Sequence, residues 1–146
     1  MTRDDLPEVK ALIDSTGLFP GEMLDGMAGD ALDGKNETER WMVLDDNGPI
    51  GVVYFAPERM TEGTWNLFLI AIHADRQGKG EGSKLLAHVE KTLADAGQRV
   101  LLVETSGNPD FEQTRRFYRN NSYIEEARIR EFYTTGEDKI VFWKKL

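Results

Sequence analysis

The chain has 146 residues, 40% of them hydrophobic and 30% charged, which is the composition expected of one globular domain covering residues 1–146. It contains no cysteine and only two histidines, so thiol chemistry is excluded and no metal site is expected. The net charge of −8 argues against a nucleic-acid partner. No apolar run is long enough for a membrane span and no signal peptide is visible, so we expect a cytoplasmic protein without a membrane partner.

Hydrophobic periodicity and turn signals predict, in chain order, two helices, a β-hairpin, a central strand, a helix, a strand, a helix and a final pair of strands. The ranges are residues 4–17, 23–32, 40–45, 51–55, 65–72, 83–97, 99–104, 111–120, 123–133 and 139–145. The fold class is therefore α/β with a mixed sheet. Antiparallel strands lead into a parallel βαβ unit and a C-terminal hairpin.

The segment around which this order is organised is Trp65 to Leu86. An apolar run, read as a strand buried on both faces, is followed by the glycine-rich turn Gln77–Gly82 and then by a helical pattern from Ser83. Such a turn directs unpaired backbone N–H groups and the positive end of a helix dipole towards one point. We therefore expect an anion there, with Arg76, Lys79 and Lys84 adding positive charge.

Two other phosphate-binding motifs fail on spacing. A nucleotide-triphosphate loop requires Gly-Lys-Ser/Thr, whereas this chain has Gly82-Ser83-Lys84. A dinucleotide fingerprint requires G-x-G-x-x-G, whereas the spacing from Gly78 is G-x-G-x-G. An ordinary strand-to-helix turn without a ligand remains the alternative for these glycines.

The motif Gln77-Gly78-Lys79-Gly80-Glu81-Gly82 has the form Q-x-x-G-x-G, which resembles the coenzyme A pyrophosphate loop of the GNAT acetyltransferase superfamily. The element order is also similar, except that relatives usually have a strand before the first helix, which here is truncated, absent or contributed otherwise. The resemblance implies acetyl-CoA as cosubstrate. The cofactor-binding residues that it implies around this loop are Leu69, Ile70, Ala71, Ile72, Gln77, Gly78, Lys79, Gly80, Glu81, Gly82 and Ser83.

The segment Thr114–Tyr123 is similar to a second motif of the superfamily, a helix ending in F-Y-x-x-x-G-F, although Ser122 and Tyr123 replace its Gly and Phe. The resemblance implies that Tyr118 is the general acid that protonates the coenzyme sulfur, since a phenol is protonated at neutral pH. Phe117 and Asn108 are assigned to the cofactor-binding set. Relatives frequently have a cofactor-contacting asparagine at the position of Phe111, and Asn108, three residues earlier, is expected to make that contact here.

A general base is less evident in the sequence. Many relatives have an acid four residues before the position of Ile70, but here that residue is Asn66, which can only hydrogen-bond a substrate. Glu104, at the C-terminal end of a parallel strand, is the candidate base, and a strand-end carboxylate facing water is its alternative interpretation. An amine of low pKa or a water relay would make a dedicated base unnecessary.

The predicted function is acetyl transfer from acetyl-CoA to a primary amine of a small molecule by direct attack in a ternary complex. Similarity of segments such as Phe132-Tyr133 and Gly136–Lys139 to a little-described GNAT subgroup implies an amino acid such as D-alanine as acceptor, with Tyr133 in the acceptor wall. A non-catalytic coenzyme A sensor and a partner-binding domain on the same scaffold are the alternatives. The oligomeric state is left open, with a homodimer among the options.

Overall fold

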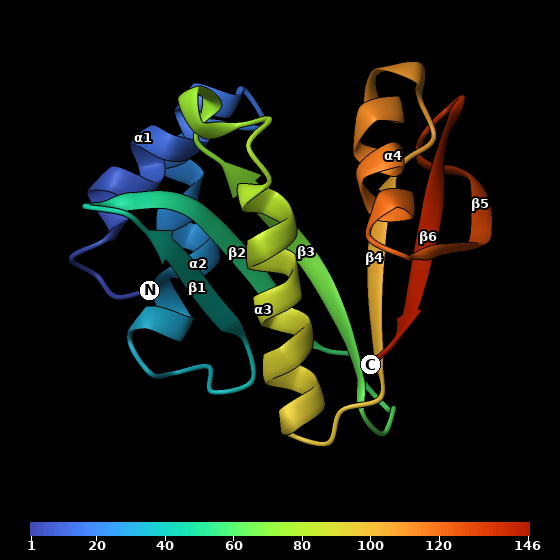
Figure 1. The fold of residues 1–146 in the computed structure, drawn as a ribbon, viewed down its shortest axis with the longest axis horizontal. Helices are drawn as coiled ribbons and strands as arrows, with labels where there is room; N and C mark the ends of the chain where they lie inside the picture. The colour runs from blue at the N-terminus through green and yellow to red at the C-terminus, as the bar shows by residue number, and fades with distance from the viewer. The chain divides into compact units, whose positions relative to one another are not determined.

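The computed structural model describes all 146 residues and divides them into two compact units, which are described separately. Unit 1 consists of Met1–Pro57 and Phe68–Val89, and unit 2 consists of Glu58–Leu67 and Glu90–Leu146. Strand β3 (Thr64–Ile72) and helix α3 (Glu81–Asp95) each contribute residues to both units (Figure 1). Six strands are hydrogen-bonded in the order β1-β2-β3-β4-β6-β5, which confirms the predicted α/β class.

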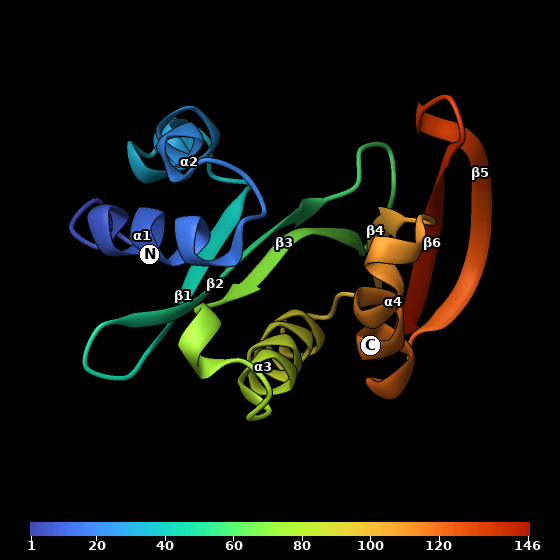
Figure 2. The same ribbon diagram turned by 90° about the horizontal axis from the view of Figure 1, so that it is seen from above.

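Unit 1 contains α1 (Leu6–Thr16), α2 (Leu24–Leu32), β1 (Arg40–Asp45) and β2 (Pro49–Pro57). Strands β1 and β2 pair in antiparallel fashion around a turn in which Asn47 has φ of 58°. Helices α1 and α2 cover one face of these strands, and the first turns of α3 cover the other (Figure 2). The apolar residues of α1 recur at helical spacing and pack into one cluster with α2 and the strands. This cluster consists of Leu6, Val9, Leu12, Ile13, Leu24, Ala28, Trp41, Val52, Leu69 and Ala71.

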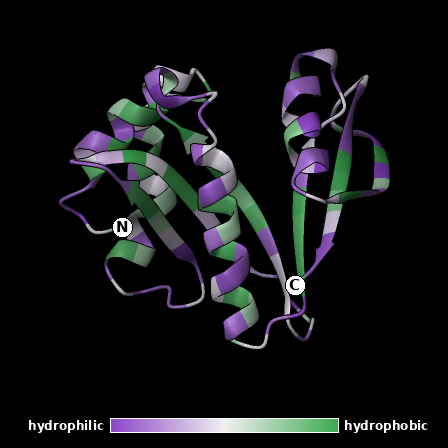
Figure 3. Cartoon of the chain, viewed as in Figure 1, coloured by the Kyte–Doolittle hydropathy of each residue, from purple (hydrophilic) through white to green (hydrophobic).

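Unit 2 contains β4 (Val100–Ser106), α4 (Glu112–Asn120), β5 (Ile124–Thr134) and β6 (Glu137–Lys145). The first residues of β3 pair in parallel with β4, and β6 lies antiparallel between β4 and β5. Helix α4 packs on this sheet through Tyr118, whose ring centroid lies 5.6 Å from that of Phe142 on β6. The strand β4 is mostly hydrophobic and α4 mostly hydrophilic (Figure 3), as expected for a buried strand and a surface helix.

Strand β5 is an edge strand whose residues are all exposed. Its register with β6 is irregular, because Ile129 pairs with Lys139 and Thr134 pairs with Glu137, so residues 130–133 oppose Asp138 alone. The Asp138 carboxylate stabilises this bulge by accepting a hydrogen bond from the Glu131 N–H at 2.8 Å. The backbone therefore leaves the regular ladder shortly before the end of the strand.

Every predicted helix and strand is present, with ends displaced by a few residues. The helix expected from Ser83 begins at Glu81, and the strand expected at 51–55 extends from Pro49 to Pro57. No strand precedes α1, as the sequence indicated, and the Met1 amino group donates a hydrogen bond to Trp41 O at 3.1 Å. None of the helices combines the length and the hydropathy that a membrane span requires.

The expectation that the central strand is buried on both faces is wrong in part. Phe68, in the middle of β3, is 54% exposed. One face of its ring stacks on Tyr54 with centroids 5.2 Å apart, and Tyr54 stacks in turn on Trp41 at 4.4 Å. Aromatic stacking thus stabilises a large ring without complete burial, and an apolar run in a sequence does not distinguish the two situations.

Replacing Leu86 with alanine tests the packing of α3. Leu86 is fully buried, so Leu86→Ala should lower the free energy of unfolding by about 2–5 kcal/mol through lost burial and the cavity left behind. Leu18→Ala is the matched control, because Leu18 is 52% exposed and its loss should change the stability little. Equal midpoints for the two variants in chemical denaturation would contradict the burial of α3.

Candidate active site

The turn between β3 and α3 presents a run of backbone amides that have no acceptor within the chain. The first helical hydrogen bond runs from Lys84 N to Gly80 O at 3.1 Å, so the amides from Gly78 to Ser83 remain free. Gly78 and Gly80 have φ of +73° and +82°, and a Cβ on either would meet no atom within 4 Å. The residues present therefore fit a bound diphosphate, because the backbone can approach it closely and every donor is available.

The turn is fixed by hydrogen bonds that leave these amides unused. The Gln77 amide nitrogen donates to Ile72 O at 3.0 Å, which ties the start of the turn to the end of β3. The Ala74 N–H donates to Ser15 Oγ at 3.1 Å, and the Asp75 N–H donates to His73 Nδ1 at 3.2 Å. Gln77, predicted to bind the cofactor, thus has a contact inside the protein that holds the loop in shape.

The three cations expected around the turn all have partners in the protein. Arg76 forms an ion pair with Asp46, Lys84 lies 3.3 Å from Glu81, and Lys79 Nζ donates to Asp75 O at 3.2 Å. These contacts are exposed and contribute little stability, so they can be exchanged for contacts with a ligand. The backbone amides are the donors that need no rearrangement.

In unit 2, Tyr118 lies in a cluster of aromatic rings. Its side chain is 4% exposed, and its ring centroid is 5.2 Å from that of Phe117, 5.7 Å from Tyr123 and 5.6 Å from Phe142. Burial raises the pKa of Tyr118 well above the value of about 10 for a free phenol. The hydroxyl is therefore protonated throughout the neutral and mildly alkaline range, as a proton donor must be.

Glu104, at the end of β4, does not face water as an isolated carboxylate. Its Oε2 lies 2.9 Å from Lys139 Nζ, and the same ammonium lies 3.6 Å above the centroid of the Phe132 ring. Phe132 contacts Tyr133 edge to face at 5.1 Å, and burial, followed by the charges of Glu104 and Glu137, raises the pKa of Tyr133. Glu104 and Phe132 thus both contact Lys139, and Tyr133 lies near enough to Glu104 for its charge to act on the phenol.

The predicted substrate contact Asn66 is almost completely buried. Its amide nitrogen donates to Glu58 Oε1 at 2.9 Å across the turn between β2 and β3, and its Oδ1 has no hydrogen-bond partner. A buried acceptor left unpaired destabilises a protein by about 1–3 kcal/mol. Asn66 Oδ1 is thus an acceptor for which the chain supplies no donor.

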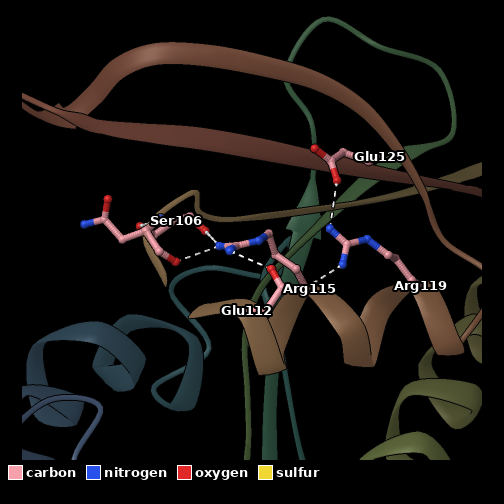
Figure 4. A network of polar contacts seen from close by, with 6 residues as sticks. Ser106, Glu112, Arg115, Arg119 and Glu125 are labelled. Carbon is pink, nitrogen blue, oxygen red and sulfur yellow. Dashed lines mark hydrogen bonds and ion pairs between the residues drawn. The ribbon is translucent and has the colours of Figure 1, made fainter. Parts of the chain in front are cut away.

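The connection between β4 and α4, which carries the predicted cofactor residue Asn108, is held by a buried arginine (Figure 4). Arg115 Nη1 donates to Ser106 O at 2.6 Å and to Asn108 O at 2.9 Å, and Nη2 lies 2.8 Å from Glu112. The bonds from Arg115 and then Arg119 lower the pKa of Glu112. The network fixes the backbone that presents the Asn108 side chain.

Helix α4 also borders a hollow of about 420 Å³. The residues that line it are Gln113, Arg116, Phe117 and Asn120. Phe117, predicted to contact the cofactor, therefore lies at an open surface of unit 2, whereas its neighbour Tyr118 is buried.

The predicted site residues fall into two groups. Unit 1 contains the end of β3, residues 69–72, and the turn at residues 77–83, whereas unit 2 contains the other predicted residues. The sequence analysis missed Glu58, Arg115 and Lys139. Arg115 lies in the second quoted motif, but its burial gave no signal in the sequence. The other two were hidden because their partners lie on neighbouring strands and depend on strand register, within a hairpin for Glu58 and between β4 and β6 for Lys139.

The chain is similar to known acetyltransferases in both sequence and structure. A sequence profile of the acetyltransferase (GNAT) domain matches residues 37–125, and no curated protein matches the chain. A solved protein from Desulfovibrio desulfuricans that is assigned to the GNAT acetyltransferases is 30% identical, with a TM-score of 0.91 over 98% of this chain and 93% of that chain. The ribosomal-protein-S18-alanine N-acetyltransferase of Escherichia coli is 20% identical, with a TM-score of 0.78 over 99% and 90%. An aminoglycoside 6'-N-acetyltransferase solved with coenzyme A is 16% identical, with a TM-score of 0.76 over 96% and 89%.

The profile match covers more than half of the chain, so the chain belongs to the GNAT family of acetyltransferases. It is accordingly an N-acetyltransferase whose cosubstrate is acetyl-CoA. The thioester of acetyl-CoA supplies the activated acetyl group, and the free amides of the turn at Gly78–Ser83 fit its diphosphate.

Replacing Gly80 with alanine tests the role of the turn. An alanine at φ of +82° is strained by about 1–2 kcal/mol, so the variant turn should relax when empty and bind coenzyme A about tenfold more weakly. Gly29→Ala is the control, because Gly29 lies in α2 with an ordinary φ and open space around its Cα. Titration calorimetry with coenzyme A that gives one affinity for both variants would contradict this role.

Replacing Arg115 with methionine tests the network in Figure 4. Two carbonyl groups lose a charged donor, so Arg115→Met should lower the free energy of unfolding by about 3 kcal/mol. Arg116→Met changes an exposed arginine of the same helix and should leave the stability near that of the wild type. Chemical denaturation of both variants measures the difference, and equal stabilities would show that the network is dispensable.

Proposed function

We propose that the protein transfers the acetyl group of acetyl-CoA to a primary amine of a small molecule by direct attack in a ternary complex. The observation that carries the proposal is the run of free amides from Gly78 to Ser83, which fits the diphosphate of the cosubstrate. In this proposal the whole chain, residues 1–146, acts as one catalytic domain. The backbone of residues 69–72 binds the pantetheine arm, and Asn108 and Phe117 add further contacts with the coenzyme.

Tyr118 is the general acid in this proposal. The amine attacks the thioester carbonyl carbon, the C–N bond forms and the C–S bond breaks, and the sulfur leaves with an electron pair that needs a proton. The raised pKa of Tyr118 keeps the phenol protonated at neutral pH, so its hydroxyl has a proton with which to hydrogen-bond the leaving sulfur. Its burial supports it further, since a donor in a dry environment interacts more strongly with developing negative charge.

The acceptor side of the proposal uses Glu104 and Tyr133, with Asn66 as a further substrate contact. Glu104 is the candidate base from the sequence for the acceptor's ammonium, and its ion pair with Lys139 holds it in position. An amino acid acceptor would bring a carboxylate of its own, and Lys139 is a buried cation that would attract it. This chemistry favours the amino acid acceptors proposed for the similar subgroup, D-alanine among them.

The rival proposal is a coenzyme A sensor without catalysis, for which Asn66 in place of an acid is the supporting observation. The neighbours described above carry names of amine-acetylating enzymes, one acting on a ribosomal protein and one on an aminoglycoside. A panel of free amino acids, polyamines, aminoglycosides and peptides therefore decides between the two proposals. Release of free thiol with any member supports the enzyme, and coenzyme A binding without release supports the sensor.

Replacing Tyr118 with phenylalanine tests the acid. Tyr118→Phe removes one hydroxyl and keeps the ring packing, so kcat for thiol release should fall by about 100-fold or more. The affinity for coenzyme A should stay the same. Tyr123→Phe is the matched control, because the Tyr123 hydroxyl donates to Glu90 at 3.0 Å and has no catalytic role in the proposal. Equal kcat values in Tyr118→Phe and the wild type would show that another group protonates the sulfur.

A further inference from the structure

A hydrogen bond in unit 2 joins the turn that follows β2 to the interior of β3. The Asn66 amide nitrogen donates to Glu58 Oε1 at 2.9 Å, and the Asn66 side chain is only 2% exposed. The other polar atom of this side chain, Oδ1, is buried without a partner in the chain. Buried polar atoms are nearly always hydrogen-bonded, so the missing partner marks the surroundings of Asn66 as unusual within the core.

Glu58 is fixed through its backbone as well as its carboxylate. Its N–H donates to Thr64 O at 2.9 Å, and its carbonyl oxygen accepts from Thr61 Oγ1 at 2.9 Å. The side chain is half-buried, and the neutral Asn66 amide is the group that its carboxylate bonds. The Glu58 carboxylate is thus held in place by a neutral amide group.

Glu104 differs from Glu58 in this respect. Its carboxylate lies 2.9 Å from the Lys139 ammonium, so it is already paired with a cation of the chain. The Glu58 carboxylate bonds a neutral amide and has no cation to displace before it meets the acceptor's ammonium.

We propose that Glu58, in place of Glu104, is the general base of the acetyl transfer and that Asn66 is its positioning residue. This inference rests on the proposed function. One proton passes from the acceptor's ammonium to the Glu58 carboxylate, and the freed lone pair forms the C–N bond with the thioester carbonyl carbon. The C–S bond breaks, and the sulfur takes its proton from Tyr118. Solvent then removes the proton from Glu58 and restores that of Tyr118.

The test compares Glu58→Gln with Glu62→Gln, which changes an exposed carboxylate in the same turn. With an amine that the wild type acetylates, Glu58→Gln should lower kcat by about 100-fold or more, as expected for loss of a general base. The KM for acetyl-CoA should not change, and Glu62→Gln should behave as the wild type. An active wild type together with an unchanged kcat in Glu58→Gln would overturn this inference alone. A wild type that acetylates no amine would instead count against the proposed function.

An assay with an acceptor amine that is already neutral at the assay pH tests whether Glu58 acts as a base or only supports the structure. Such an amine needs no proton removed before attack, so kcat of Glu58→Gln should approach that of the wild type. A loss of the same size with this acceptor would mean that Glu58 acts through structure and would overturn the assignment.

The role of Asn66 is tested by combining variants. If Asn66 positions Glu58, the loss in the variant Asn66→Ala/Glu58→Gln should be clearly smaller than the product of the two single losses. Multiplied losses in the double variant would show that Asn66 acts independently and would overturn its role as a positioning residue. Because Asn66 is buried, the unfolding temperature of each variant is measured beside its kinetics.

Discussion

The constraint on which the rest of the structure depends is the set of backbone amides between β3 and α3 that have no acceptor in the protein. A helix must begin somewhere, and its first N–H groups are always left over. In most helices a side chain or water satisfies them, whereas here a turn with two positive-φ glycines leaves several further amides without an acceptor in the chain. The site is thus made of main chain, and the side chains around it act by holding the turn in shape.

In unit 2 the candidate functional groups are side chains, and each is held by its own surroundings. Burial keeps the Tyr118 phenol protonated, an ion pair fixes Glu104, and a neutral amide orients Glu58. Two of these groups are chemically identical carboxylates, yet one is paired with a cation and the other with a neutral amide. The surroundings of each group therefore differ more than its residue type alone would suggest.

The sequence was sufficient for most of the fold, because hydrophobic periodicity is a local property. The glycine-rich turn was also predictable, since its function depends on backbone conformation that glycines signal directly. The exposure of Phe68 was not predictable, because its stacking partner Tyr54 belongs to another strand. The hydrogen bond between Asn66 and Glu58 was also not predictable, because it depends on the register of the hairpin formed by β2 and β3. The contact of Lys139 with Phe132 depends on the bulge in β5, for which the sequence contains no local signal.

The irregular end of β5 has a consequence for solubility. A long exposed edge strand offers unpaired N–H and C=O groups to any extended chain that approaches it, which is the first step of intermolecular sheet growth. In this protein the ladder is broken between Ile129 and Thr134, where the Asp138 carboxylate occupies the Glu131 N–H. A foreign strand aligned with the beginning of β5 would lose its match at this point, so the same distortion that brings Phe132 over Lys139 also discourages aggregation along the edge.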